Sequence, residues 1–432
     1  MEFVGSVRPA ALVKYLPRFG WEVIVLTPAR AGVRRGENVI ETGYRDVLTD
    51  WKVRFKLDRE RGLHEQFGLT TASQPGSALF HTRLLNFVKY ILTYPDERKG
   101  WIPFAVDAVR KIPSQNLDIS AIVTTSPPIT SHLIGRRAKK ILGCPWIVDL
   151  RDLWTQNLGE RTPQFLQVGL EKRTLRDADA LVTVSEPWAS RLKHRYPDKK
   201  IYSITNGFDP DDYSSPAPLL TREFSITYTG QLYEGQRDPS LLFEVVRGLI
   251  DQNAIPAEDL RIRFYGDIES WLPLLVARHG LERVVELNGP KLRKDVMELQ
   301  RESQLLLLLP WSDPRETGHH SAKLFEYLAA GRPVLAVGGS HGVLTEALKE
   351  TGAGVHALSA AEVRNFLLKA YAEFEKDGRV SYNGNSPAIA QYSHPEMARR
   401  FAQVLDSIAT GPGAETKHTE VTLQPDLPRQ TV

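Results

Sequence analysis

A lysine and a glutamate three residues apart lie in the first turns of a short predicted helix and could together hold a nucleotide. The helix begins after Ser321, a residue type that caps helix N-termini, and ends at Gly331, which suits the left-handed turn that closes a helix. Free N–H groups at the helix start favour phosphate, and the charge of Lys323 adds to that attraction. The carboxylate of Glu326 can accept from both hydroxyls of a ribose. A surface Lys–Glu pair on an ordinary amphipathic helix has the same spacing, so spacing alone leaves both interpretations open.

A loop after the predicted strand at 224–229 offers further phosphate contacts. It supplies Gly230, Gly235 and Arg237. An arginine can bind a phosphate with two parallel N–H bonds. A surface salt bridge is the alternative role for Arg237.

Three charged residues follow the predicted strand at 146–150 and are candidates for the chemistry at an acceptor. Asp149 and Asp152 could take the proton of an attacking hydroxyl, and Arg151 could bind the acceptor. An Arg–Asp pair that only holds the loop is an equal alternative. His132 is a second base candidate or a partly buried residue of the predicted helix at 129–142. Arg8 could meet an anionic acceptor or be a solvated residue at a helix start.

Strands and helices alternate twice along the chain, which predicts an α/β protein with two parallel sheets. Turn residues at 206–213 separate the two alternations. We therefore predict a Rossmann-like domain at 1–205, which carries the acceptor-binding candidates, and a second Rossmann-like domain at 206–390, which carries the nucleotide-binding candidates. A crossover helix at 391–409 and a disordered tail at 410–432 complete the prediction.

The beginning of the first domain is unusual. A doubly wound half normally starts with a central strand that leads into its first helix, but only 1–4 precede the glycine of the first predicted helix. We expect the first strand to be absent from the sequence as given. An empty position would leave two neighbouring strands without hydrogen-bond partners, unless another segment fills it.

The composition describes a soluble globular protein and excludes several classes. The net charge of +3 over 432 residues does not favour nucleic acid, and the sole cysteine, Cys144, excludes an intramolecular disulfide framework. No apolar run approaches the ~20 residues of a membrane-spanning helix. We expect a cytoplasmic protein, with neither a metal site nor a cofactor. Scattered basic residues of the first domain could contact a membrane peripherally: Arg30, Arg34, Arg35, Lys52, Arg54 and Lys56.

Four segments together resemble a known family: PDERKGWIPFA, TSPPITSHL, WIVDLRDLWTQN and FEYLAAGRPVLA. They resemble retaining glycosyltransferases of family 4, which have the GT-B fold, and in particular the exopolysaccharide and lipopolysaccharide subgroup. The resemblance implies that Glu326 binds the donor's ribose. Two positions depart from the family pattern: Gly318 stands where a second glutamate is frequent, and Gln231 where an arginine usually binds diphosphate. Arg237 stands near the position of a family lysine.

The resemblance further implies two domains facing across a cleft, with a C-terminal helix crossing back to the first domain. It implies transfer of a sugar from a UDP- or GDP-sugar to a hydroxyl of a glycan or lipid-linked acceptor in cell-surface polysaccharide synthesis. The reaction would retain the anomeric configuration by front-side substitution, at the inner face of the membrane if the acceptor is a lipid. Two alternatives remain open: a non-catalytic paralogue that scaffolds an assembly complex, and a nucleotide-sugar epimerase.

Overall fold

The computed structural model describes residues 4–29, 36, 38–54, 56, 87–115, 117–155, 164–313, 318–409 and 418–423. Contacts divide the chain into two compact units. The first-sheet unit comprises Leu12–Thr183, Ala189–Ser203 and Arg399–Val432, and the second-sheet unit comprises Met1–Ala11, Val184–Trp188 and Ile204–Ala398. The predicted domain boundary at 205/206 stays a prediction, and the second-sheet unit also takes two short segments, Met1–Ala11 and Val184–Trp188, from the range predicted for the first domain.

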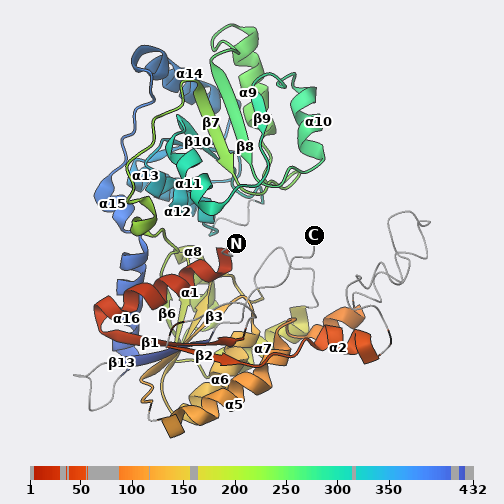
Figure 1. Ribbon diagram of the computed structural model, residues 1–432, viewed down its shortest axis with the longest axis vertical. Coiled ribbons are helices and arrows are strands. Elements are labelled where there is room, and N and C mark those ends of the chain that lie inside the picture. Colours follow the sequence, from red (N-terminus) through yellow and green to blue (C-terminus); the bar gives the residue numbers. More distant parts are fainter. Residues whose placement is uncertain are drawn as a thin grey trace. The chain divides into compact units, whose positions relative to one another are not determined.

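All strands of the first-sheet unit are parallel and form one seven-stranded sheet (Figure 1). In spatial order these are β2 (Val39–Thr42), β1 (Trp21–Pro28), β13 (His418–Leu423), β3 (Ala121–Ser126), β4 (Trp146–Leu150), β5 (Ala180–Thr183) and β6 (Lys200–Ser203). The predicted strands at 21–26, 121–124, 146–150, 180–184 and 201–204 are thus confirmed. In β3, β4 and β5 every residue is buried, as expected for strands covered on both faces of the sheet.

The described helices of the first-sheet unit follow its strands in alternation, and α5 and α6 pack against each other beside β3 (Figure 1). They are η1 (Leu16–Phe19), α2 (Val47–Arg54), η2 (Lys99–Trp101), α5 (Ile102–Lys111), η3 (Ile112–Gln115), α6 (Thr130–Leu142), α7 (Gln164–Leu175) and α8 (Glu186–Arg195). Two further helices, α1 (Val4–Tyr15) and α16 (His394–Ile408), each contribute residues to both units.

The position between β1 and β3 is occupied by a strand from residues 418–423. β13 lies between β1 and β3, pairing Trp21–Leu26 with His418–Leu423 on one side and Ala121–Thr124 with Glu420–Leu423 on the other. The expectation of a disordered tail is therefore wrong for 418–423. The physical reason is that β1 and β3 each present backbone N–H and C=O groups that need a partner, which outweighs the weak aliphatic pattern of this segment.

The second-sheet unit contains a six-stranded parallel sheet (Figure 1). Its order is β12 (Gly354–Ala357), β11 (Val334–Val337), β10 (Leu305–Leu308), β7 (Phe224–Thr229), β8 (Leu260–Tyr265) and β9 (Val285–Leu287). Its helices are η4 (Pro210–Tyr213), α9 (Ser240–Asp251), α10 (Trp271–Arg278), α11 (Arg293–Arg301), α12 (Ala322–Ala330), α13 (Val343–Thr351), α14 (Ala360–Asp377) and α15 (Ser386–Ala390).

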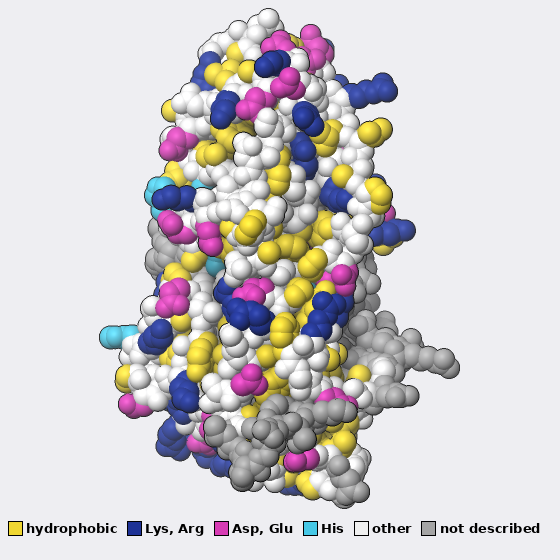
Figure 2. Space-filling view, turned by 90° about the vertical axis from the view of Figure 1, so that its left-hand side faces the viewer, with side chains coloured by type: hydrophobic (Ala, Val, Ile, Leu, Met, Phe, Trp, Pro, Cys, Tyr) yellow, Lys and Arg dark blue, Asp and Glu magenta, His cyan; other side chains and the backbone are white. Residues whose placement is uncertain are grey.

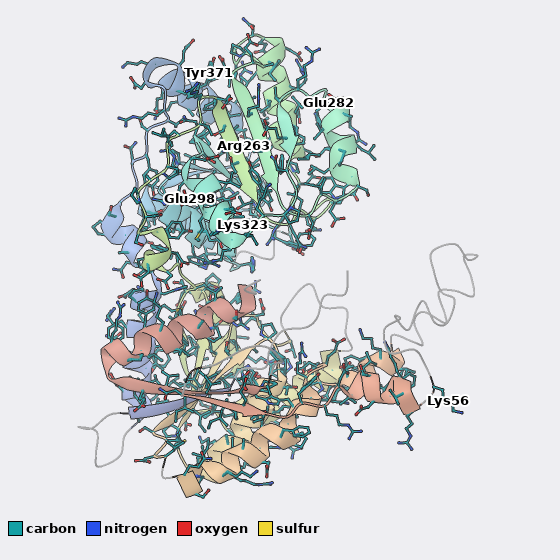
Figure 3. The ribbon with its side chains drawn as sticks, in the orientation of Figure 1. Lys56, Arg263, Glu282, Glu298, Lys323 and Tyr371 are labelled. Carbon is teal, nitrogen blue, oxygen red and sulfur yellow. The ribbon has the colours of Figure 1, made fainter. Side chains whose placement is uncertain are left out.

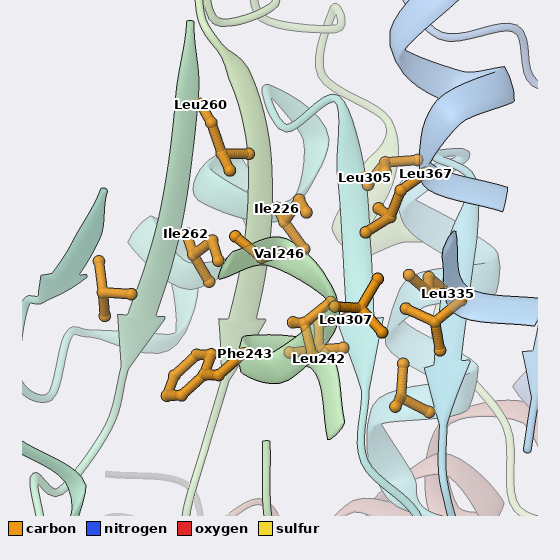
Figure 4. Close-up of a cluster of buried hydrophobic side chains, with 14 of the residues drawn as sticks. Ile226, Leu242, Phe243, Val246, Leu260, Ile262, Leu305, Leu307, Leu335 and Leu367 are labelled. Atoms are coloured by element: carbon orange, nitrogen blue, oxygen red, sulfur yellow. The ribbon is translucent and has the colours of Figure 1, made fainter. Parts of the chain in front are cut away.

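The leucine run of β10 shows how this sheet is covered on both faces. Leu305 and Leu307 point into a core formed with α9, α10 and α14 (Figure 4). Leu306 and Leu308 point to the opposite face, where α12 and α13 pack. Successive residues of a strand alternate between faces, so an unbroken leucine run indicates a strand buried on both sides. α12 is thereby fixed against the sheet through its apolar side chains.

Candidate functional site

The N-terminus of α12 is open. Ser321 occupies the N-cap position with φ −65° and ψ 136°, as predicted, but its side chain makes no capping hydrogen bond. Gly331 closes the helix at φ 65°, also as predicted, and Leu324, Phe325 and Leu328 are buried. By contrast, Asp96 fills the N-terminus of α6 by accepting from the backbone N–H of Thr130 at 2.6 Å. The start of α12 therefore retains its attraction for an anion.

Lys323, which is labelled in Figure 3, lies in the first turn of α12. Its ammonium lies 5.2 Å from the centre of the Tyr228 ring, and a Cβ at Gly230 would stand 2.4 Å from its Cε. Gly230 has φ 119°, a backbone conformation that favours glycine. Burial, reinforced by the charge of Arg237, lowers the pKa of Lys323 to about 8, with Glu326 acting in the opposite direction. The Lys323 ammonium therefore lies beside the open N-terminus of α12 and can bind an anion there.

Arg237 supplies a second cation. Its guanidinium lies 5.6 Å from the ring centre of Tyr233 and 5.7 Å from that of Trp311. The guanidinium Nε is buried and has no hydrogen-bond partner in the described part of the chain. Arg237 and Ser321 line one pocket, whose other lining residues include Trp311, Asp313, His319, Ser340 and Gly342. The pocket therefore presents a cation and a helix start to the same space.

Glu326 lies one turn beyond Lys323 and its carboxylate is about one-third exposed, at 30 %. The side-chain amide of Gln300 donates to Oε2 of Glu326 across 3.3 Å. Arg293 approaches the other oxygen, Oε1, to 4.0 Å and pairs with Asp212 at 3.1 Å. The phenol of Tyr213 donates to the backbone carbonyl of Glu326. The carboxylate is therefore held from one side and keeps acceptor capacity for a ligand.

The structure thus brings together the residues predicted for nucleotide binding: Glu326, Lys323, Arg237, Gly230 and Ser321. Sequence reasoning missed Gln300, Arg293, Tyr233 and Trp311. Gln300 and Arg293 lie on α11, and no spacing within that helix relates them to a residue of α12. Only the aromatic pair could have been noticed, since cations favour the faces of Tyr and Trp rings.

The two departures from the family pattern have structural counterparts. A Cβ on Gly318 would lie 2.5 Å from Cδ1 of Trp188 and 2.6 Å from its Nε1, so the indole excludes any larger residue there. The amide of Gln231 donates to Asp267 at 3.1 Å and accepts from the Tyr233 phenol at 2.8 Å. Gln231 therefore braces the loop that carries Arg237.

In the first-sheet unit, the acidic candidates follow β4. Asp149 is fully buried and accepts from the Thr125 hydroxyl at 2.8 Å, whereas Asp152 is partly exposed. Arg151 donates to the carbonyls of Ser126 and Pro127, at 3.0 and 2.7 Å. These bonds join the loops after β3 and β4, and Asp152 has the accessibility that a proton acceptor needs.

His132 is fully buried in the first turn of α6. The Trp146 indole donates to the Thr124 hydroxyl at 2.9 Å, and that hydroxyl lies 2.8 Å from Nδ1 of His132. If Thr124 accepts from Trp146 and donates to Nδ1, the imidazole carries its proton on Nε2, which has no partner in the described residues. Burial, with the nearby charge of Arg151, lowers the pKa of His132 to about 3. The ring is therefore neutral and offers a donor at Nε2.

Arg8 is buried, with 3 % of its surface exposed. It donates to the carbonyls of Ile204 and Thr205, both at 2.9 Å, and to Asn206 at 3.2 Å. Its contact with Met397 joins α1 to α16. The guanidinium thus organises the second-sheet unit, and its predicted role in acceptor binding stays a prediction.

Three further features of the described residues concern metal binding, membrane-spanning helices and exposed basic side chains. No three His, Cys, Asp or Glu side chains gather there in a way that could hold a metal ion. None of the helices described combines the length and the apolar run that crossing a bilayer requires. Of the basic residues considered for membrane contact, Lys52 is buried, Arg54 and Lys56 are exposed, and the others lie outside the described residues. On the face drawn in Figure 2, the described Lys and Arg side chains are interspersed with Asp and Glu.

Residues 5–207 match the model of the glycosyl transferase 4-like domain. This segment of the chain is therefore similar to a glycosyl transferase 4-like domain. No curated protein matches the chain significantly. Among solved structures, HepE from Anabaena in complex with UDP and glucose matches with a TM-score of 0.52 at 15% identity, covering 89% of this chain and 99% of HepE. A glycosyltransferase from Rickettsia africae ESF-5 matches with a TM-score of 0.53 at 14% identity, covering 94% of this chain and 96% of that protein.

At these identities the structural likeness establishes the fold. The chain has the GT-B fold, with two Rossmann-like parallel sheets and a C-terminal helix that contacts α1, as expected from the sequence.

Proposed function

We propose that this protein is a retaining glycosyltransferase that moves a sugar from a UDP-sugar to a hydroxyl of a glycan or lipid-linked acceptor in cell-surface polysaccharide synthesis. The observation that carries the proposal is the convergence of Lys323, Arg237 and the open start of α12, with Glu326 one turn away. Two cations and a helix N-terminus suit a diphosphate, and the carboxylate suits a ribose. UDP is preferred to GDP because HepE was crystallised with UDP.

In the proposed reaction, bond breaking at the anomeric carbon leaves negative charge on the diphosphate. Lys323, Arg237 and the N–H groups of α12 stabilise that charge, which is the contribution that usually matters most in such transfers. They supply positive charge that a metal ion supplies in other transferases, so we propose a metal-independent reaction. The incoming hydroxyl attacks from the face that the diphosphate leaves, and configuration is retained.

The acceptor is proposed to meet the loops after β3 and β4. Asp152 is the first candidate for receiving the hydroxyl proton, and Asp149, buried behind it, is the second. His132 would serve as a neutral hydrogen-bond donor through Nε2 rather than as a base, since the favoured tautomer already carries a proton there. Arg151 and Arg8 remain the candidates for an anionic group of the acceptor.

We also propose that the protein works in the cytoplasm and contacts the inner face of the membrane peripherally when its acceptor is a lipid. Exposed basic residues such as Arg54 and Lys56 support this. Each basic residue near anionic lipid contributes ~1 kcal/mol. Failure to co-sediment with anionic vesicles at low salt would remove the membrane part and leave the transfer reaction untouched.

The first test is calorimetric binding of UDP and GDP to the wild-type protein and to Glu326→Ala. We expect UDP to bind more tightly than GDP and Glu326→Ala to weaken UDP binding about tenfold or more, because two ribose hydrogen bonds to a charged acceptor are lost. Glu298→Ala is the matched control, since Glu298 lies on the neighbouring helix α11 and pairs only with Arg301 among the ion pairs described. Equal binding in wild type and Glu326→Ala would refute the proposed site.

A second candidate function is nucleotide or glycan binding without transfer. Gly318, excluded from bearing a side chain by Trp188, and Gln231, engaged with Asp267, both replace residues of the family pattern and favour it. Release of free sugar from UDP-sugars, followed by mass spectrometry, separates the two functions. A protein that binds UDP tightly, yet neither hydrolyses nor transfers any sugar, is a binding paralogue.

A further inference from the structure

We propose that Gln300 is a positioning residue that orients the carboxylate of Glu326 and thereby sets the preference of the nucleotide site for ribose over deoxyribose. This inference rests on the proposed function, because it takes Glu326 to be the residue that binds the ribose. It concerns a side chain from another helix, α11, that reaches the site only through Glu326.

Gln300 is fully buried near the end of α11, with no exposed surface. Its Nε2 lies 2.9 Å from the Thr229 hydroxyl and 3.3 Å from Oε2 of Glu326. Its Oε1 is buried and has no hydrogen-bond partner among the described residues. The side chain thus bridges the end of β7 and the second turn of α12 while leaving one of its own polar atoms unsatisfied.

The orientation of this amide follows from its partners. A carboxylate oxygen only accepts, so the NH₂ group rather than the carbonyl must face Glu326. The second N–H then donates to Thr229. The Thr229 hydroxyl lies 3.4 Å from the Tyr327 hydroxyl, which also accepts from the Thr229 backbone N–H at 3.2 Å. Both N–H groups of the Gln300 amide therefore have acceptors. Residues of β7, α11 and α12 form the hydrogen-bond network that supports Glu326.

This arrangement decides where the carboxylate points. Gln300 holds Oε2, whereas the guanidinium of Arg293 lies 4.0 Å from Oε1 and competes for the same group. A ribose cis-diol needs two acceptor positions in a fixed orientation. Without the amide, the carboxylate is free to turn towards Arg293, and its hydrogen bonds to the hydroxyls weaken. Because the NH₂ group of Gln300 must face Glu326, its Oε1 is left without a hydrogen-bond partner among the described residues.

The test compares the affinities of UDP and 2′-deoxy-UDP, measured by calorimetry on the full chain. We expect Gln300→Leu to reduce the preference for UDP about 3-fold to 10-fold, with a smaller loss of affinity for 2′-deoxy-UDP, which keeps only one of the two hydroxyls. Gln304→Leu is the matched control. Gln304 is also fully buried, but its amide donates to the carbonyls of Thr221 and Gly378, away from Glu326. This control should lower stability and leave the preference for UDP unchanged.

Gln300→Glu provides a readout that a merely structural role would not move. It places a second carboxylate beside Glu326, and two such groups at this distance share one proton at low pH. We expect near-normal preference for UDP at about pH 5.5, where the protonated member donates as the amide does, and loss of the preference by about pH 8. The wild-type and Gln300→Leu preferences should not change over this range.

The outcomes separate the inference from the function on which it rests. An unchanged preference for UDP in Glu326→Ala would show that Glu326 does not bind the ribose, and the proposed site itself would fail. Loss of the preference in Glu326→Ala, with normal preference in both Gln300 variants at every pH, would overturn the role of Gln300 alone. If Gln300→Leu fails to fold, the pH profile of Gln300→Glu still decides.

Discussion

Lys323 makes the proposed nucleotide site sensitive to pH. Its ammonium sits over the Tyr228 ring, next to the cation of Arg237, and its lowered pKa of about 8 follows from that setting. A diphosphate in the pocket would favour the charged form. Protonation of one side chain and nucleotide affinity are therefore linked.

We expect UDP affinity to be constant between about pH 7 and 7.5 and to fall above about pH 8, by at most ~10-fold per pH unit, as Lys323 loses its proton. The sign is opposite for the unliganded fold. Because the pKa of Lys323 is lower in the folded than in the unfolded chain, its contribution to stability rises with pH between about 8 and 10.5. Calorimetric titration of UDP across this range measures the first effect.

Lys323→Arg is the control for this prediction, because a guanidinium stays charged throughout. It should remove the fall in affinity above pH 8. A fall of the same size in this variant would assign the pH dependence to another group.

The sequence predicted some residues of the proposed nucleotide site better than others. Lys323, Glu326 and Ser321 belong to one helix, so their spacing alone predicts that they lie together. Arg237 could be added only because parallel strands end at one edge of a sheet. The role of Gln300 could not be predicted. A polar residue on an amphipathic helix is expected to be exposed, and its partners on β7 and α12 are known only from the structure. The fold was more predictable, because buried parallel strands are continuous aliphatic runs, as in β10 and β11.

At the scale of elements, β13 is the feature that sequence patterns did not predict. Its pairing with β1 and β3 makes it a central strand, although its sequence is polar and it follows a long segment without an aliphatic pattern. Position in the sheet, rather than side-chain pattern, explains it: both neighbours have unpaired edges without it.

We expect removal of residues 410–432 to destabilise the first-sheet unit by about 3 kcal/mol or more, since several backbone hydrogen bonds on each side of β13 are lost. Hydrogen exchange followed by mass spectrometry should show faster exchange in β1 and β3 and unchanged exchange in β7 and β10. A synthetic peptide of residues 410–432, added to the truncated protein, should restore protection. Unchanged exchange in β1 and β3 after truncation would contradict the central position of β13.

At the scale of the whole molecule, three of the described helices, α1, α8 and α16, contribute to both units. α16 gives His394–Ala398 to the second-sheet unit and Arg399–Ile408 to the first-sheet unit, and α1 is divided in the same way at Ala11. Within the second-sheet unit Arg8 binds the connecting segment 204–206, and within the first-sheet unit the Trp21 indole donates to Asp406 at 3.0 Å. In each unit, a side chain from α1 or β1 therefore bonds to a segment far from it in the sequence.

We expect Arg8→Met to lower the free energy of unfolding by about 2–4 kcal/mol, because backbone carbonyls of the 204–206 segment lose a charged donor. Denaturant unfolding followed by tryptophan fluorescence measures the loss. Lys294→Met, which removes an exposed cation from the second-sheet unit, should change stability by less than about 0.5 kcal/mol. A normal stability of Arg8→Met combined with a raised KM for the acceptor would instead support the acceptor-binding role of Arg8.

The central place of β13 in the first sheet has a consequence for synthesis on the ribosome. The elements of the second-sheet unit, β7 to α15, are contiguous in the chain and emerge before β13 is made. Domains generally fold as they emerge, with the N-terminal one first. Here the described strands β1 to β6 of the first sheet precede the second sheet in the chain, but β13, which lies between β1 and β3, follows it, so the pairing of the first sheet is completed only after residues 418–423 are made. Until then β1 and β3 expose open strand edges, which makes the nascent chain a substrate for chaperones that bind unpaired strands.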